Sequence, residues 1–150
     1  MALLELKNLK TFFATKRGTV KAVNGVSYSL DAGKVLGVVG ESGSGKSVSA
    51  MSILRLLDGN GYIDSGEILF NGQDLTKLSM NEMYKIRGNE ISVIFQEPMT
   101  SLNPVFTVSR QISEPLMIHQ GMTKKQAAVK AIELLSDVKI PNPEVVAKQY

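Results

Sequence analysis

Alternating apolar and polar residues near the N-terminus predict two strands. Residues 3–9 alternate in this way, and residues 26–30 repeat the pattern. A period of two is typical of a strand that buries one face. The stretch 11–25 between them is basic and contains several turn-forming residues, so we expect a turn-rich connection there.

Two later stretches, 34–40 and 90–95, are short and predominantly apolar on both faces. Strands of that kind are typical of a parallel sheet that is covered on both sides. Residues 66–75 predict another strand, which ends in an Asn-Gly turn. The first half of the chain therefore predicts a sheet of several strands.

Helical spacing predicts a first helix over residues 47–57, directly after a glycine-rich stretch. Its apolar face comprises Val48, Met51, Leu54 and Leu57. A short helix is expected further along, because Ser79 and Glu82 have the spacing of a capping box.

The chain beyond Asn103 has mainly helical patterns. Residues 107–119 have helical spacing, and Pro115 within them should kink or shorten that helix. Thr123 and Gln126 form a second capping-box pattern. The helix that begins there should bury one face, made of Ala127, Ala128, Ala131, Ile132 and Leu135.

Composition excludes several functional classes. The chain has 150 residues, 43% of them hydrophobic and 21% charged, which fits a globular protein of one domain. A net charge of +3 does not by itself indicate nucleic-acid binding. Cysteine is absent and His119 is the only histidine, which argues against disulfides, zinc sites and histidine-based triads. No apolar run approaches the about 20 residues that span a membrane.

The sequence GESGSGKS at residues 40–47 matches the G-x-x-x-x-G-K-[ST] pattern of a phosphate-binding loop. Its glycines allow unusual φ values and a close approach of the backbone to a phosphate. The following helix adds free N–H groups and the positive end of its dipole. We expect contacts to a nucleotide triphosphate from Gly40, Glu41, Ser42, Gly43, Ser44, Gly45, Lys46, Ser47 and Val48.

Two side chains of this loop carry the chemistry. Lys46 adds a positive charge for the β- and γ-phosphates, and Ser47 offers a hydroxyl to the Mg²⁺ that bridges them. The alternative is a flexible glycine-serine turn, which would not require Lys-Ser at the start of a helix. The pattern indicates nucleotide binding and does not identify the nucleotide.

Phosphate-loop enzymes also need an acid at the end of a neighbouring strand, which holds Mg²⁺ and orients the attacking water. The candidate here is ISVIFQEP, in which Gln96 stands where an aspartate is expected. Glutamine cannot balance the charge of the metal. Its amide oxygen can still ligate Mg²⁺ or hold a water molecule.

The sequence FQEPMTSLNP, following a phosphate loop at this distance, resembles the glutamine loop of ABC-transporter ATPases. More narrowly, it resembles the ATP-binding subunits of oligopeptide, dipeptide and nickel importers. Two longer stretches are similar to the same family: KAVNGVSYSLDAGKVLGVVGESGSGKS and GEILFNGQDLTKLSMNEMYKIRGNEISVIFQEPMTSLNP. The resemblance covers nearly the whole chain.

This resemblance implies an α/β fold with a P-loop NTPase (RecA-like) core, an N-terminal antiparallel β-subdomain and part of a helical subdomain. Residues 1–103 would form the N-terminal part of the ATPase core, with the β-subdomain, the phosphate loop and the glutamine loop. Residues 104–150 would begin the helical subdomain.

The resemblance also implies how the base of ATP is held. Phe13 falls where the family places an aromatic side chain that stacks on adenine, and Val20 would pack beside the base. A flat apolar ring is a suitable stacking surface. Phe12 competes for the role because adjacent strand residues face opposite ways, and Phe13 can instead belong to the core.

The resemblance implies that the cofactors are ATP and Mg²⁺. Gln96 and Ser47 would bind the metal, and Lys46 and Gln96 would take part in catalysis. The parent protein would be an ATPase that couples ATP binding and hydrolysis to peptide import. Its partners would be transmembrane permease subunits, a second homologous ATPase subunit and, indirectly, an extracytoplasmic substrate-binding protein, with no nucleic acid. It would lie at the cytoplasmic face of the cell membrane.

Family features that come later in the sequence are missing before Tyr150. The Ser-Gly-Gly signature, the acidic (Walker B) strand and the switch histidine do not occur, and His119 is too early for the last. We therefore expect an N-terminal fragment of a longer protein, with negligible hydrolysis of its own. A sheet without a strand beside Val35–Val39 would leave apolar edges open, so we expect marginal stability and self-association.

Several alternatives remain open at this level. The substrate can be nickel instead of peptide, and an ABC ATPase can serve DNA repair or translation instead of transport. A small kinase or GTPase would need an Asp-Glu or N-K-x-D motif, and neither occurs here. The isolated chain can also be a nucleotide-binding module without catalytic activity.

Overall fold

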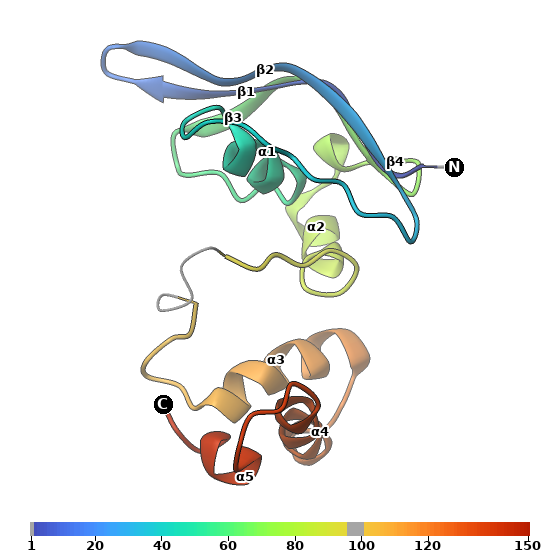
Figure 1. Ribbon diagram of the computed structural model, residues 1–150, viewed down its shortest axis with the longest axis vertical. Helices are drawn as coiled ribbons and strands as arrows, with labels where there is room; N and C mark the ends of the chain where they lie inside the picture. The colour runs from blue at the N-terminus through green and yellow to red at the C-terminus, as the bar shows by residue number, and fades with distance from the viewer. Residues whose placement is uncertain (1, 96–100) are drawn as a thin grey trace. The chain divides into compact units, whose positions relative to one another are not determined.

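The computed structural model describes residues 2–95 and 101–150 and divides the chain into two compact units, one up to Tyr84 and one from Lys85 onward (Figure 1). The first unit contains β1 (Ala2–Thr15), β2 (Gly18–Asp31), α1 (Lys46–Ile53), β3 (Gly61–Phe70), β4 (Gln73–Asp74) and the 3₁₀ helix η1 (Leu75–Lys77). Helix α2 (Met80–Ile86) extends across the division, and the second unit contains α3 (Val108–Gln120), α4 (Lys124–Asp137) and α5 (Pro143–Val146). The helices within the described residues are all too short or too polar to cross a membrane.

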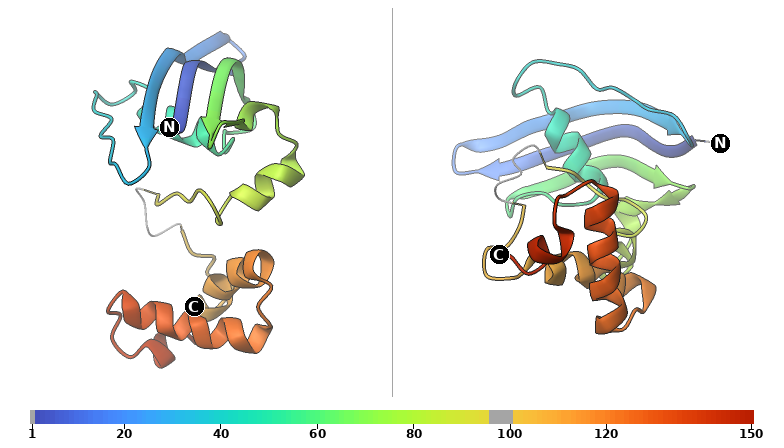
Figure 2. Two further views of the ribbon diagram at one scale, coloured as in Figure 1. Left: turned by 90° about the vertical axis from the view of Figure 1, so that its right-hand side faces the viewer. Right: turned by 60° about the horizontal axis from the view of Figure 1, so that its bottom comes forward.

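The sheet of the first unit is antiparallel throughout, with strand order β2-β1-β3-β4 (Figure 2). The expected turn-rich connection over 11–25 is wrong, because β1 and β2 continue through it and only Lys16 and Arg17 form the turn. Cross-strand pairing explains the difference. Residues from Lys10 to Thr15 find partners along β2, so their backbone groups are satisfied in a ladder.

Helix α1 packs on the sheet through polar side chains. Ser49 and Ser52 are its buried residues. The hydroxyls of Ser52 and Thr11 of β1 lie 2.8 Å apart, and Ser52 Oγ also donates to Val48 O at 2.7 Å. Small hydroxyl side chains allow the helix to approach the strand closely, and their mutual hydrogen bonds offset the cost of burying them.

The apolar face predicted for this helix is therefore only partly correct. Leu54 is buried, whereas the other three predicted residues are half-buried, and the helix ends at Ile53 instead of residue 57. The remaining core of the unit comes from the sheet and from η1: Leu6, Leu9, Ile68 and Leu75 are almost fully buried.

The Asn-Gly turn is confirmed. Asn71 and Gly72 have φ values of 49° and 79° and connect β3 to β4. Positive φ at both positions matches the right-handed twist of the two strands that the turn joins. The tight turn leads directly into Asp74 and η1.

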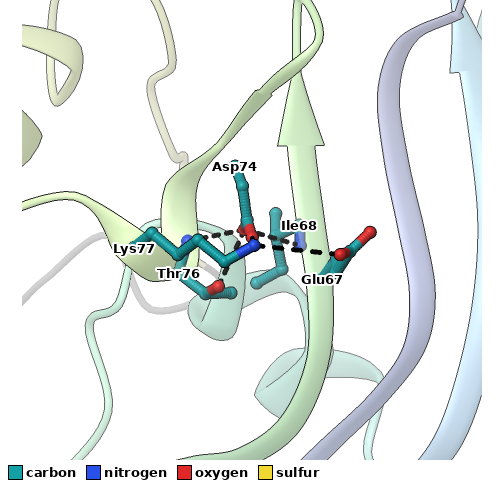
Figure 3. Close-up of polar contacts among 5 residues, drawn as sticks. All are labelled: Glu67, Ile68, Asp74, Thr76 and Lys77. Carbon is teal, nitrogen blue, oxygen red and sulfur yellow. Dashed lines mark hydrogen bonds and ion pairs between the residues drawn. The ribbon is translucent and has the colours of Figure 1, made fainter.

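Asp74 gathers the polar contacts that hold η1 on the sheet (Figure 3). Its Oδ1 accepts hydrogen bonds from Thr76 N at 3.0 Å and from Thr76 Oγ1 at 2.7 Å, and Ile68 N lies at 3.5 Å. Its Oδ2 lies 2.9 Å from Lys77 Nζ, which also lies 3.9 Å from Glu67. Burial raises the pKa of Asp74, but the hydrogen bonds from Lys77, Thr76 and Ile68 together outweigh it and hold the pKa below its ordinary value of 3.8.

The two parallel strands that the sequence predicts are not formed. Stretches 34–40 and 90–95 contain no regular strand, and within the described residues the latter has only an isolated bridge between Ile91 and Arg87. Val35, Val39 and Ile94 are 96–98% exposed. A strand that is apolar on both faces needs neighbours along both edges and layers on both sides, and no other described segment pairs with either stretch.

The chain beyond Asn103 is helical, as predicted, with α3, α4 and α5. Thr123 and Gln126 form a complete capping box at the start of α4. Helix α4 packs on α3, and its residues Ala127, Ala131 and Leu135 are buried, while Ala128 and Ile132 are half-buried. The Ser79–Glu82 capping box is also confirmed, with Ser79 N donating to Glu82 Oε2 at 2.7 Å and Glu82 N to Ser79 Oγ at 3.3 Å.

Helix α3 continues through Pro115 and ends at Gln120, so the predicted shortening does not occur. A proline removes one donor from the helical ladder. The buried side chain of Leu116, whose carbonyl also accepts from the N–H of Gly121 at the helix end, secures the turns on either side.

The Asp74 contacts lead to a prediction about pH. Asp74→Asn should lower the free energy of unfolding near neutral pH by at most about 1 kcal/mol, because the charge that pairs with the exposed Lys77 is lost. The folded pKa lies below the ordinary value of 3.8, so this stabilisation is present above that value and is lost as pH falls through the folded pKa. Denaturant unfolding of both proteins at about pH 7 and about pH 2 measures it.

The difference between wild type and Asp74→Asn should be smaller at the acidic pH. Glu67→Gln is the matched control, because its carboxylate is 3.9 Å from the same ammonium and 47% exposed. This control should change stability by less than about 0.5 kcal/mol. An Asp74 effect that persists unchanged in acid would contradict the assignment.

The exposed apolar stretches lead to a second prediction. We expect the chain to self-associate, because unpaired backbone and apolar side chains occur together at Val35, Val39 and Ile94. Sedimentation velocity should show oligomers for the wild type and a shift toward monomer for Val35→Lys combined with Ile94→Lys. Val129→Lys, on the exposed face of α4, should leave the distribution unchanged. A monomeric wild type at the same concentration would refute the expectation.

Candidate phosphate-binding loop

The loop at residues 40–47 leads into α1 through two glycines with left-handed backbone. Gly43 and Gly45 have φ values of 80° and 88°, and Gly45 is the N-cap of the helix, without a side-chain cap. Gly45 has a second reason to lack a side chain. A Cβ there would lie 2.3 Å from the carbonyl oxygen of Ala22 in β2, so this glycine also allows the loop to contact the sheet.

The start of α1 presents backbone donors. The N–H of Ser49 makes the hydrogen bond to Gly45 O, at 2.8 Å, that opens the helical ladder. The amides of Lys46, Ser47 and Val48 precede that bond, and helices leave such amides without intrahelical partners. Together with the positive end of the helix dipole, they form the arrangement that binds anions at helix N-termini.

Lys46 spans the loop. Its Nζ donates to Gly40 O and to Glu41 O, both at 2.6 Å, and lies 3.3 Å from Ser44 Oγ. Within the described part of the chain, no carboxylate lies within ion-pair distance of this ammonium. The positive charge of Lys46 is therefore held at the loop by dipoles and is not neutralised there.

A cavity of 220 Å³ lies beside the loop. One wall comes from β2, with Val23, Val26 and Tyr28, and the other comes from Val38 and Val39, the loop and α1. Ser47, at the start of the helix, is exposed. The arrangement combines an apolar surface with backbone donors, a cation and an accessible hydroxyl, which are the groups that a phosphate ester and a hard cation require.

Phe13 and Val20 are cross-strand partners on β1 and β2. Val20 is exposed, and Phe13 is half-buried with its ring against Gly61. Phe12 is buried, and its ring packs edge-on against Tyr62 at 6.3 Å between centroids. The structure thus brings Phe13 and Val20 together and assigns Phe12 to packing, while the adenine role of Phe13 stays a prediction.

Gln96 lies outside the described residues, so its expected contact with a metal stays a prediction. Within the described residues no group of three or more His, Cys, Asp or Glu side chains could hold a metal ion. Of the residues predicted to hold a metal, the structure therefore describes Ser47 alone, whose exposed hydroxyl is a suitable hard ligand.

Sequence reasoning missed three residues that position the loop. The carbonyl of Ala22 lies against Gly45, and the hydroxyls of Thr11 and Ser52 connect β1 to α1. Ser49 and Ser52 recur at helical spacing, which is the one local signal that a polar face of α1 is buried. Nothing local in the sequence relates Ala22 or Thr11 to the loop, because both contacts cross between elements far apart in the chain.

Comparison with known proteins identifies the family. The model of the family described as ABC transporter matches residues 23–149. The oligopeptide transport ATP-binding protein AppD of Bacillus subtilis (strain 168) is 48% identical over 149 residues, which are 99% of this chain and 45% of AppD. The dipeptide transport ATP-binding protein DppD of Lactococcus lactis subsp. cremoris (strain MG1363) is 49% identical over 148 residues, which are 98% of this chain and 42% of DppD.

A solved structure confirms the fold class. The dimeric bacterial ABC transporter cassette MJ0796 superposes with a TM-score of 0.79 at 22% identity, over 97% of this chain and 60% of that chain. The chain thus spans less than half the length of the two curated relatives. Because the family model covers most of the chain and includes the phosphate-binding loop, this chain belongs to the ABC transporter family.

Proposed function

We propose that this chain is the ATP-binding N-terminal portion of the nucleotide-binding subunit of an ABC importer for oligopeptides or dipeptides. The observation that carries the proposal is the phosphate loop at the N-terminus of α1, with its capping Gly45 and the ammonium of Lys46 held across it. The peptide substrate is supported by the two relatives described above, which are oligopeptide and dipeptide transport ATP-binding proteins.

The triphosphate would bind along the loop. The backbone N–H groups at the start of α1 would donate to phosphate oxygens, and Lys46 would exchange its carbonyl acceptors for the β- and γ-phosphates. Ser47 and Gln96 would supply a hydroxyl and an amide oxygen to Mg²⁺, which prefers hard oxygen ligands. When bound, the metal would neutralise charge on the phosphates.

The adenine would stack on Phe13 with Val20 beside it. This assignment is supported by their pairing across β1 and β2 and by the exposure of Val20 at the surface of the sheet. Phe12 is unsuitable because its ring is buried against Tyr62, with Lys21 Nζ 5.7 Å from its centroid.

In the complete protein, ATP binding would close two homologous ATPase subunits and reshape the permease subunits, and hydrolysis would reset them. The subunit would lie at the cytoplasmic face of the membrane and depend on an extracytoplasmic binding protein for its peptide. Hydrolysis by the 150-residue chain alone should be negligible, because phosphoryl transfer depends on positioned groups that this sequence does not contain.

Nucleotide binding is tested by thermal unfolding with and without Mg-ATP. A ligand at 100 times its Kd that binds only the native state adds about 2.7 kcal/mol of stability, or about 5–10 °C for a domain of this size. Lys46→Ala should abolish the shift, because the loop loses its only full positive charge. The matched control Lys125→Ala, an exposed lysine of α4, should retain it. A wild type that is not stabilised at all would contradict the proposal.

The adenine site is tested by comparing two ligands. Phe13→Ala should weaken ATP binding by about 5- to 150-fold, because base stacking on an aromatic ring contributes about 1–3 kcal/mol. Binding of inorganic triphosphate should be unchanged, since the phosphate loop is intact. Isothermal titration with both ligands measures the difference.

Phe12→Ala is the control for this comparison. It removes a buried ring, so it should lower the melting temperature without singling out ATP over triphosphate. Equal losses for the two ligands in Phe13→Ala would show that Phe13 is a core residue and not a stacking surface.

A further inference from the structure

The start of helix α3 is held by the side chain of a single glutamine. Gln111 Oε1 accepts a hydrogen bond from Asn103 N at 2.7 Å. Its Nε2 donates to Asn103 O at 3.0 Å and to Phe106 O at 2.9 Å. One side-chain amide thus closes the segment 103–106 onto the helix that follows it.

The same segment has further contacts that define its conformation. Phe106 N donates to Asn103 O at 3.2 Å, and Val105 N donates to Asn103 Oδ1 at 3.1 Å. The guanidinium carbon of Arg110 lies 3.7 Å from the centroid of the Phe106 ring. Two successive residues of α3, Arg110 and Gln111, therefore hold the two ends of one short segment.

The first turn of α3 also binds the C-terminal part of the chain. Val108 N donates to Gln149 O and Ser109 N donates to Ala147 O, both at 2.9 Å. Figure 1 shows the C-terminal segment beside the start of α3. These bonds satisfy two amides that a helix N-terminus leaves without intrahelical partners.

The two sets of contacts meet at Thr107, the N-cap of α3. Its side chain accepts from Arg110 N, and its carbonyl accepts from Gln111 N at 3.2 Å. Releasing segment 103–106 would free the chain immediately before this cap, so the first turn would fray and its bonds to Ala147 and Gln149 would weaken.

We propose that Gln111 is a positioning residue that fixes segment 103–106 against α3 and, through the first turn of that helix, ties this segment to residues 147–149. The functional role of this connection rests on the proposed function. Segment 103–106 follows Gln96, the proposed metal ligand, in the sequence, and Gln111 holds this segment on α3.

The proposal is tested by amide hydrogen exchange on the 150-residue chain without nucleotide. Gln111→Leu removes three hydrogen bonds, each corresponding to about two- to tenfold in an opening equilibrium. Exchange at Asn103 should therefore rise at least tenfold, and exchange at Val108 and Ser109 should rise with it. Exchange at the buried Ala131 of α4 should not change.

Gln111→Glu separates the acceptor from the donors. A carboxylate can still accept from Asn103 N, but it cannot donate to the carbonyls of Asn103 and Phe106. Protection at Asn103 should be largely retained near neutral pH, while Val108 and Ser109 lose part of theirs. Below about pH 4 the protonated acid again has a donor, and the loss relative to wild type at the same pH should shrink.

Gln126→Leu is the matched control, because Gln126 uses the same amide chemistry to cap α4 and accepts from Thr123 N at 2.9 Å. It should accelerate exchange at Thr123 and leave Val108 unchanged. If Gln111→Leu accelerated exchange equally at Ala131, Gln111 would contribute only to the general stability of the helical unit. If exchange at Val108 and Ser109 did not change, the proposed connection between segment 103–106 and residues 147–149 would be refuted. Because nucleotide is absent from this assay, a failure of ATP binding would be recognised separately in the melting experiment.

Discussion

The structure depends first on the pairing of β1 with a strand on each side. This central strand satisfies its backbone groups with β2 and β3, and it also carries the contact of Thr11 with Ser52 that seats α1. Ala22 of β2 then receives Gly45 at the end of the phosphate loop. The sheet thus positions the loop through Ala22 and Thr11, which lie outside the phosphate-loop pattern at 40–47.

The same requirement for pairing explains what is not formed. Stretches 34–40 and 90–95 have the composition of buried strands, yet Val35, Val39 and Ile94 are almost fully exposed. Hydrophobic pattern gives a segment a tendency to be buried, but a strand needs a neighbour for its N–H and C=O groups. No described segment pairs with either stretch, so their apolar side chains stay exposed.

Hydrogen bonds at helix starts organise both units. In the first unit the amides at the start of α1 are available to an anion, because Gly45 provides no side-chain cap. In the second unit the corresponding amides of α3 are used by carbonyls of Ala147 and Gln149. The same backbone feature is open to an anion at the start of α1 and anchors the C-terminal segment at the start of α3, depending on which acceptors the surrounding fold supplies.

The sequence by itself determined the features that depend on residues close together in the chain. The Thr123–Gln126 capping box, the Asn71–Gly72 turn and the phosphate-loop pattern at 40–47 each act within one turn or loop, so spacing alone predicts them. Tertiary structure decided the extent of the β1–β2 hairpin, the serine-lined face of α1 and the choice between Phe12 and Phe13 for packing. These outcomes depend on partners far away in the sequence, whose identity becomes known only when the strands have paired.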